Sequence, residues 1–171
     1  MKNFNNKGFT IVELMIAFSL TMVVVVLLFQ IVLTLKDIYV SSGIKTEIFT
    51  KNSNFIRFVQ NDLHNKSLVS FTSCGTQCYQ FGYSDGSNIQ LSTNIAQRTI
   101  SYGKHTIQLV DGSVMNSMYV DVYTDSTALE GLDDTIVSVI IPIKNKLFPT
   151  ENYNINIVFQ NDTRSGFVVN V

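Results

Sequence analysis

GFTIVELMIAF, residues 8–18, opens the longest apolar stretch of the chain and contains a single charged residue, Glu13. The apolar character continues to Leu35, and none of the 22 residues from Leu14 to Leu35 is charged. At ~1.5 Å per residue a helix of that length spans roughly 33 Å, which is enough to cross the hydrocarbon core of a bilayer. The stretch therefore predicts a membrane-spanning helix with an acidic residue near its start.

The residues before this stretch are short, mostly polar and basic, with Lys2 and Lys7. A secretory signal has an apolar region of only ~7–15 residues followed by small residues at a cleavage site, and neither feature is present here. Basic residues stay on the cytoplasmic side of a span. We expect a single-pass anchor in the cell membrane, with the N-terminus in the cytoplasm and the C-terminal part outside.

Glu13 needs an explanation, because an acidic side chain is unfavourable in a membrane helix and no basic residue in the run can pair with it. The segment Gly8-Phe9-Thr10-Ile11-Val12-Glu13-Leu14, after a short basic leader, resembles the class III leader of type IV prepilins and pseudopilins. This resemblance implies that a prepilin peptidase cuts between Gly8 and Phe9 and methylates the new amine of Phe9. Residues 1–8 would then be a cleaved leader.

Cleavage would give Glu13 a partner, namely the positive α-amino group of Phe9. Residues four apart share one face of a helix, so the pair could form within one chain. In the family that Gly8–Leu14 resembles, the glutamate instead neutralises the N-terminus of an adjacent subunit during assembly. Both alternatives stay open. The implied partners are other pilin or pseudopilin subunits, the prepilin peptidase and an inner-membrane assembly platform.

Beyond Leu35 the helix is expected to continue, so that it runs from Phe9 to Asn65. Residues 9–35 would form the transmembrane and filament-core half, and residues 36–66 an amphipathic second half. The amphipathic half is predicted from apolar residues at helical spacing, which are Ile44, Ile48, Phe55, Ile56, Val59 and Leu63. Ser41-Ser42-Gly43 is a weak point at which a kink is expected.

Residues 67–171 predict an extracytoplasmic domain of antiparallel sheet, because short alternating segments are separated by turn residues. The expected strands are residues 79–83, 88–92, 99–102, 105–110, 118–123, 135–143, 153–160 and 166–171. Asp85-Gly86 and Gly103-Lys104 mark hairpin turns. The fold class is α+β, with a long N-terminal helix packed against the sheet in a pilin-like layout.

Two further segments indicate a subtype. FIRFVQNDL, residues 55–63, is similar to the second helix half of J-type minor pseudopilins and their competence-type relatives. ISYGKHTIQLVDG, residues 100–112, is similar to the first sheet strands of those proteins. A minor subunit of a type IV pilus or of a secretion or competence pseudopilus is therefore preferred over a major one. The alternative outside this family is a membrane-anchored binding module that enters no fibre, and the system served stays open.

The chain has two cysteines, Cys74 and Cys78, in the part predicted to lie outside the cytoplasm. A local disulfide is favoured in such a compartment, and two free thiols are the alternative. The C-x₃-C spacing is not that of a redox dithiol, and two cysteines without nearby histidines do not complete a zinc site.

Catalytic and nucleic-acid-binding motifs are not evident in the sequence. The 12 basic and 13 acidic residues are nearly balanced, which gives no basic footprint for nucleic acid. Neither histidine belongs to a nucleophile or zinc motif, so we predict no enzyme, no resident cofactor and no metal. One weak calcium candidate is an acidic loop, where a solvated loop is the favoured alternative; it holds Asp125, Glu130, Asp133 and Asp134.

Overall fold

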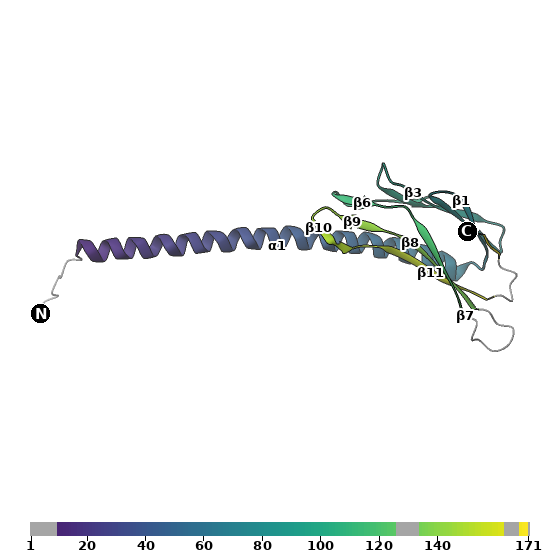
Figure 1. Cartoon of the computed structure of the whole chain (residues 1–171), viewed down its shortest axis with the longest axis horizontal. Coiled ribbons are helices and arrows are strands. Elements are labelled where there is room, and N and C mark those ends of the chain that lie inside the picture. The colour runs from purple at the N-terminus through teal and green to yellow at the C-terminus, as the bar shows by residue number, and fades with distance from the viewer. Residues whose placement is uncertain (1–9, 126–133, 163–167, 171) are drawn as a thin grey trace, which may run out of the picture. The chain divides into compact units, whose positions relative to one another are not determined.

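The computed structural model describes residues 10–125, 134–162 and 168–170. The chain divides into two compact units, Met1–Gly43 and Ile44–Val171. The predicted boundaries after residues 8, 35 and 66 stay predictions. The class is α+β, as the sequence indicates: one long helix, α1, followed by antiparallel sheets (Figure 1).

Helix α1 extends over Ile11–Asn65, so its C-terminal end lies at the residue predicted for it. Phe9, the predicted first residue, lies outside the described residues. Helical structure is unbroken through residues 41–43, where a kink is expected from sequence. Each residue from 11 to 40 is exposed, which leaves a helix surface of almost continuous hydrocarbon.

The second half of α1 packs on the sheets along the predicted apolar stripe. Ile48, Phe55 and Val59 are buried, and Ile44, Ile56 and Leu63 pack partly buried against the same core. The stripe also contains a buried polar residue that the apolar pattern omits. Asn52 is 7% exposed, and its Nδ2 donates to the backbone oxygen of Tyr153 at 3.0 Å, which satisfies the amide in the core.

The described residues form twelve strands in three sheets, where one sheet is expected from sequence. The six-stranded sheet has the order β12-β1-β2-β3-β4-β5. Its strands are β1 (Leu68–Gly75), β2 (Cys78–Tyr83), β3 (Asn88–Asn94), β4 (Thr99–Tyr102), β5 (His105–Gln108) and β12 (Val168–Asn170). All its pairs are antiparallel except β1–β12, which is parallel.

The two smaller sheets have three strands each. One has the order β10-β9-β6 and consists of β6 (Ser113–Met115), β9 (Ile143–Asn145) and β10 (Phe148–Asn152). The other has the order β11-β8-β7 and consists of β7 (Tyr119–Asp125), β8 (Asp134–Ile141) and β11 (Ile155–Asp162).

The predicted strand over residues 135–143 is wrong as a single strand. It divides at Pro142 into β8, which lies in one small sheet, and β9, which lies in the other. Proline has no backbone N–H to donate to a ladder, so the strand ends there and the chain changes sheets. The carbonyl oxygen of Pro142 still accepts from the N–H of Asn116 at 3.0 Å.

The two predicted hairpin turns are confirmed. Between β2 and β3, Gly86 has a φ of 80° and Asp85 Oδ1 accepts from the N–H of Ser87 at 2.8 Å. Between β4 and β5, Gly103 has a φ of 58° at the first of two loop residues, where a two-residue hairpin favours glycine.

An ion pair connects α1 to β10 within the unit 44–171. Lys45 Nζ lies 2.5 Å from Glu151 Oε1, and the Tyr153 hydroxyl donates to Glu151 Oε2 at 2.6 Å. The hydrogen bond from Lys45, followed by that from Tyr153, holds the pKa of Glu151 below its ordinary value of 4.5. A lowered pKa in the folded protein means that the carboxylate stabilises the fold above the unfolded-state pKa and loses this effect as pH falls through the folded value.

We expect Glu151→Gln to weaken the dependence of thermal stability on pH below about 4.5, the ordinary glutamate value. Melting temperatures of the full chain in detergent, measured between neutral and acidic pH, test this. Lys45→Met should remove much of the same dependence, and the double variant should add little because the two groups act as a pair. Fully additive effects of the two substitutions would contradict the assignment.

Candidate functional site

The first turn of α1 is built around Thr10 and Glu13. The backbone N–H and the Oγ1 hydroxyl of Thr10 both donate to Glu13 Oε2 at 3.0 Å, and the N–H of Glu13 donates to Thr10 Oγ1 at 3.3 Å. This reciprocal arrangement is a capping box, in which Thr10 is the N-cap and Glu13 the third helical residue. The box satisfies N–H groups that a helix start leaves without partners.

Glu13 therefore has a local partner, Thr10, which the distribution of charges in the sequence does not indicate. The T-x-x-E spacing of Thr10 and Glu13 is the sequence signature of a capping box and would have revealed Thr10. Both contacts from Thr10 use Oε2, and no hydrogen bond joins Oε1 to any residue that the structure describes. One carboxylate oxygen thus orients the side chain while the other is available to a donor from elsewhere.

The polar groups that interrupt the apolar helix are mostly satisfied within it. The hydroxyls of Ser19, Thr21 and Thr34 donate to the carbonyl oxygens of Met15, Ala17 and Gln30, four residues earlier. Such internal hydrogen bonds allow these residues to lie in hydrocarbon at little cost. Among residues 10–35, Glu13 is the only one with a formal charge.

Helix α1 contains a segment long and apolar enough to cross a membrane, with a mean hydropathy of 2.8 over its most apolar window and no buried residue there. The core helix of a soluble protein would instead be largely buried. The exposed apolar surface fits membrane anchoring, followed by contact with other apolar helices.

The other predicted site residues lie apart from this helix segment. A disulfide joins Cys74 at the end of β1 to Cys78 at the start of β2, with the Cα atoms 5.1 Å apart, so it closes the β1–β2 turn. Gly8 lies outside the described residues, as do Glu130 and Asp133 of the calcium candidate. Asp125 and Asp134 are backbone partners at the ends of β7 and β8. The calcium site stays a prediction; within the described ranges no cluster of three or more ligating residues occurs.

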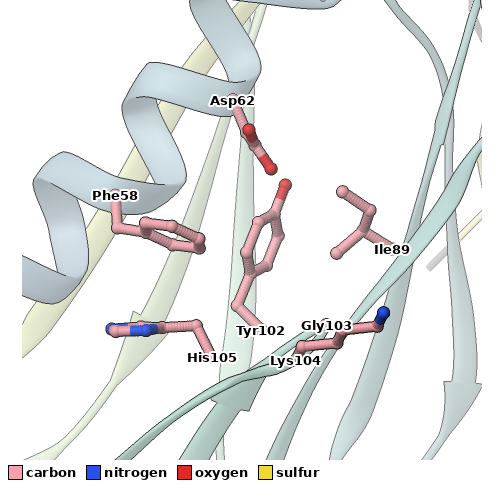
Figure 2. A pocket seen from close by; sticks show the side chains of 7 residues that line it. All are labelled: Phe58, Asp62, Ile89, Tyr102, Gly103, Lys104 and His105. Carbon is pink, nitrogen blue, oxygen red and sulfur yellow. The ribbon is translucent and has the colours of Figure 1, made fainter.

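A separate pocket of about 290 Å³ opens beside α1 and the β4–β5 turn (Figure 2). Its lining consists of Phe58, Asp62, Ile89, Tyr102, Gly103, Lys104 and His105. Figure 2 shows the Phe58 ring stacked over the His105 imidazole, with 4.4 Å between ring centroids, and Asp62 pointing toward the Tyr102 hydroxyl. That hydroxyl is hydrogen-bonded to Tyr83. The imidazole therefore packs against an aromatic ring, as a structural histidine does.

One family model matches the part of the chain that contains Thr10, Glu13 and the first turns of α1. Residues 3–29 match the family model described as the prokaryotic N-terminal methylation motif. No curated protein and no solved structure gives a significant match to the chain.

The chain thus carries a prepilin-type methylation motif, the class III leader of type IV pilins, on an exposed apolar helix. The motif and the α+β layout are together consistent with the pilin and pseudopilin family, whose members are structural proteins rather than enzymes. They support a pilin-like subunit that is processed by prepilin peptidase and assembles with other pilin subunits.

Proposed function

We propose that this protein is a minor structural subunit of a type IV pilus or of a related secretion or competence pseudopilus. It is cleaved between Gly8 and Phe9, methylated at Phe9 and assembled through its N-terminal helix. The observation that carries the proposal is the capping box at Thr10 and Glu13, which lies inside the matched motif and at the start of the exposed apolar part of α1, residues 11–40.

The exposed helix supports storage in the membrane and later burial in a fibre. Residues 11–40 present apolar side chains on every face, and such a surface needs lipid or other apolar helices around it. Leaving lipid for a bundle of equivalent helices exchanges one apolar environment for another, so packing and charge pairing decide assembly.

We propose that Glu13 fixes the position of each subunit along the axis of that helix bundle. In apolar surroundings an unpaired carboxylate or ammonium is costly, whereas a paired one is tolerated. The amine that cleavage creates at Phe9 is a suitable partner, and Glu13 Oε1 is available to accept from it. We propose that the amine comes from an adjacent subunit, because a subunit shifted along the axis would then leave both charges unpaired.

The minor role rests on the resemblance of two segments to minor pseudopilins and their competence-type relatives. Residues 55–63 include Phe55 and Val59 of the buried face of α1, and residues 100–112 contain β5 and most of β4. We propose that the protein first lies in the cytoplasmic membrane, where one span holds it with the N-terminus inside. The membrane assembly platform then transfers it into a periplasmic or cell-surface fibre.

The N-terminus of the protein purified from a host with prepilin peptidase tests the proposal. We expect intact-mass and N-terminal peptide spectra to show a chain that begins at Phe9 and carries one methyl group on its amine. Gly8→Val should retain the leader, because the added side chain obstructs the close approach that glycine permits. An intact leader on the unmodified sequence in that host would support the anchored-module alternative.

A further inference from the structure

Strand β7 forms one edge of the sheet β11-β8-β7 (Figure 1). All seven of its residues, Tyr119–Asp125, pair with β8 in a register without shifts. No hydrogen bond connects residues 119–123 to any described strand other than β8. Within the described residues, the outward N–H and C=O groups of this regular seven-residue strand therefore have no strand partner.

The exposure of the β7 side chains shows that the edge is uncovered on both sides of the sheet. Tyr119 and Tyr123 point to the outer side and are 45% and 65% exposed. Val122 points to the core side, yet it is 47% exposed, whereas its partner Val137 on β8 is fully buried. Nothing in the described part of the chain packs beyond β7.

Four of the other five edges of the described sheets are protected in the usual ways. Strands β5, β6 and β12 have only three or four residues, and β10 contains Pro149 and a register shift. On β11, the opposite edge, the core-side residues Ile155 and Ile157 are fully buried. Strand β7 has no proline, lysine, arginine or bulge. Its mid-strand charge, Asp121, does not block the edge, but it restricts the registers that a second strand can adopt.

We infer that β7 pairs with β7 of a second copy of this chain, antiparallel, about a two-fold axis at Val122. In an antiparallel pair, residues directly opposite each other point their side chains to the same side of the sheet. A two-fold axis must therefore pass through a residue position that pairs with itself, and not between two residues. An axis at Asp121 would place two carboxylates opposite each other, which is destabilising. An axis at Tyr123 would place Asp121 of one copy opposite Asp125 of the other. An axis at Val122 pairs all seven residues of the strand and places no two carboxylates directly opposite each other.

The Val122 register keeps the two Asp121 carboxylates from lying directly opposite each other. On the outer side, Asp121 of each copy lies opposite Tyr123 of the other copy, and the two Asp121 residues are only diagonal neighbours. Tyr123 of each copy is the diagonal neighbour of Tyr119 of the other copy, within reach of an aromatic ring. On the core side, the two Val122 side chains meet and cover the apolar surface that one copy leaves exposed. The pairing satisfies the outward backbone groups and covers part of the exposed apolar surface of Tyr119, Val122 and Tyr123.

This pairing is independent of the proposed fibre role. A two-fold interface is closed, so it joins two copies and cannot by itself extend into a filament. The residues involved all belong to the unit Ile44–Val171, whereas fibre assembly is proposed to use the N-terminal helix. Failure of one idea would leave the other standing.

Cross-linking of the full chain in detergent tests the pairing. Cys74 and Cys78 are joined in a disulfide, so Val122→Cys supplies one reactive thiol. A short bis-maleimide should convert this variant to a covalent dimer, because residues on the axis face each other. Val158→Cys is the matched control, since Val158 is 48% exposed on β11, away from the β7 edge, and it should stay monomeric. Equal cross-linking of the two variants would overturn the inference.

A charge substitution provides a second readout that does not depend on thiol geometry. Val122→Lys should abolish the dimer in sedimentation or mass photometry, whereas Val158→Lys should retain it. Both valines are about half exposed, so neither variant should lose its fold, and thermal unfolding checks this. A Val122→Lys protein that dimerises like the unmodified chain would overturn the pairing.

Discussion

Glu13→Val is expected to leave leader cleavage and membrane insertion intact but to reduce incorporation of the subunit into a fibre. The substitution leaves the Phe9 amine of an adjacent subunit in apolar surroundings without its carboxylate. Removing one partner of a buried ion pair costs about 3–5 kcal/mol, so each contact should weaken by about a hundredfold or more. The fraction of the subunit in sheared fibres, relative to the fraction in membranes, measures this.

Two controls separate charge from other effects of the substitution. Glu13→Gln keeps the side-chain length and the capping contacts with Thr10 but removes the charge, so it should assemble almost as poorly as Glu13→Val. Thr34→Val removes a polar group whose hydrogen bond stays within its own helix, so it should assemble normally. Wild-type levels of Glu13→Gln in fibres would show that capping, and not charge pairing, is the role of Glu13.

Phe55→Ala should cause a large loss of folding stability in the unit 44–171. Phe55 is fully buried on the helix face that packs on the sheets, and its ring lies 6.3 Å from the imidazole of His105 on β5. Truncation of a buried phenylalanine to alanine costs about 3–5 kcal/mol, because apolar contacts are lost and a cavity remains. For a unit of this size the melting temperature should fall by roughly 6–20 °C.

The signal should come from the sheets, because the exposed half of α1 can stay helical in detergent after the core unfolds. Near-ultraviolet circular dichroism reports the buried tyrosines and is suited to this purpose. Phe49→Ala is the matched control on the same helix, since Phe49 is 61% exposed and has one edge contact with Tyr153. Equal destabilisation by the two substitutions would contradict the assigned packing face.

The sequence predicts the helix well because its two halves have unambiguous patterns. An uncharged run of 22 residues and a stripe at helical spacing each specify one structure, and the helix ends at Asn65 as expected. Asn52 departs from the stripe because a buried amide can be satisfied by a distant backbone oxygen, here that of Tyr153. That partner is 101 residues away, so no local pattern indicates it.

The sheet arrangement is less predictable because strand pairing depends on contacts between distant residues. The hairpin turns follow from Gly86 and Gly103, which specify local backbone conformations. By contrast, β12 joins β1 in parallel across almost one hundred residues, and Pro142 moves the chain from one sheet to another. The proline in the sequence indicates that break, whereas no local pattern indicates the order of the strands in the sheets.

Part of the candidate site can be predicted from the sequence, because it depends on local signals. Glu13 stands out because charge is rare in an apolar run, and Thr10 follows from the T-x-x-E spacing once capping is considered. The open edge at β7 has no such signature, since YVDVYTD resembles any half-buried strand. Only the position of the strand in the sheet shows that its outer edge pairs with no other described strand.

The capping box has a consequence for the timing of maturation. Every atom that closes it belongs to Thr10 or Glu13, on the side of Gly8 that the subunit would retain after cleavage. The first turn of the helix is therefore complete in the precursor, and removal of the leader requires no refolding. Under the proposed processing, cleavage would change only the charge at the N-terminus. It would create an amine that can pair with the Glu13 carboxylate of an adjacent subunit, which Thr10 already orients. The precursor and the mature chain should therefore have the same helix content and differ in their ability to assemble.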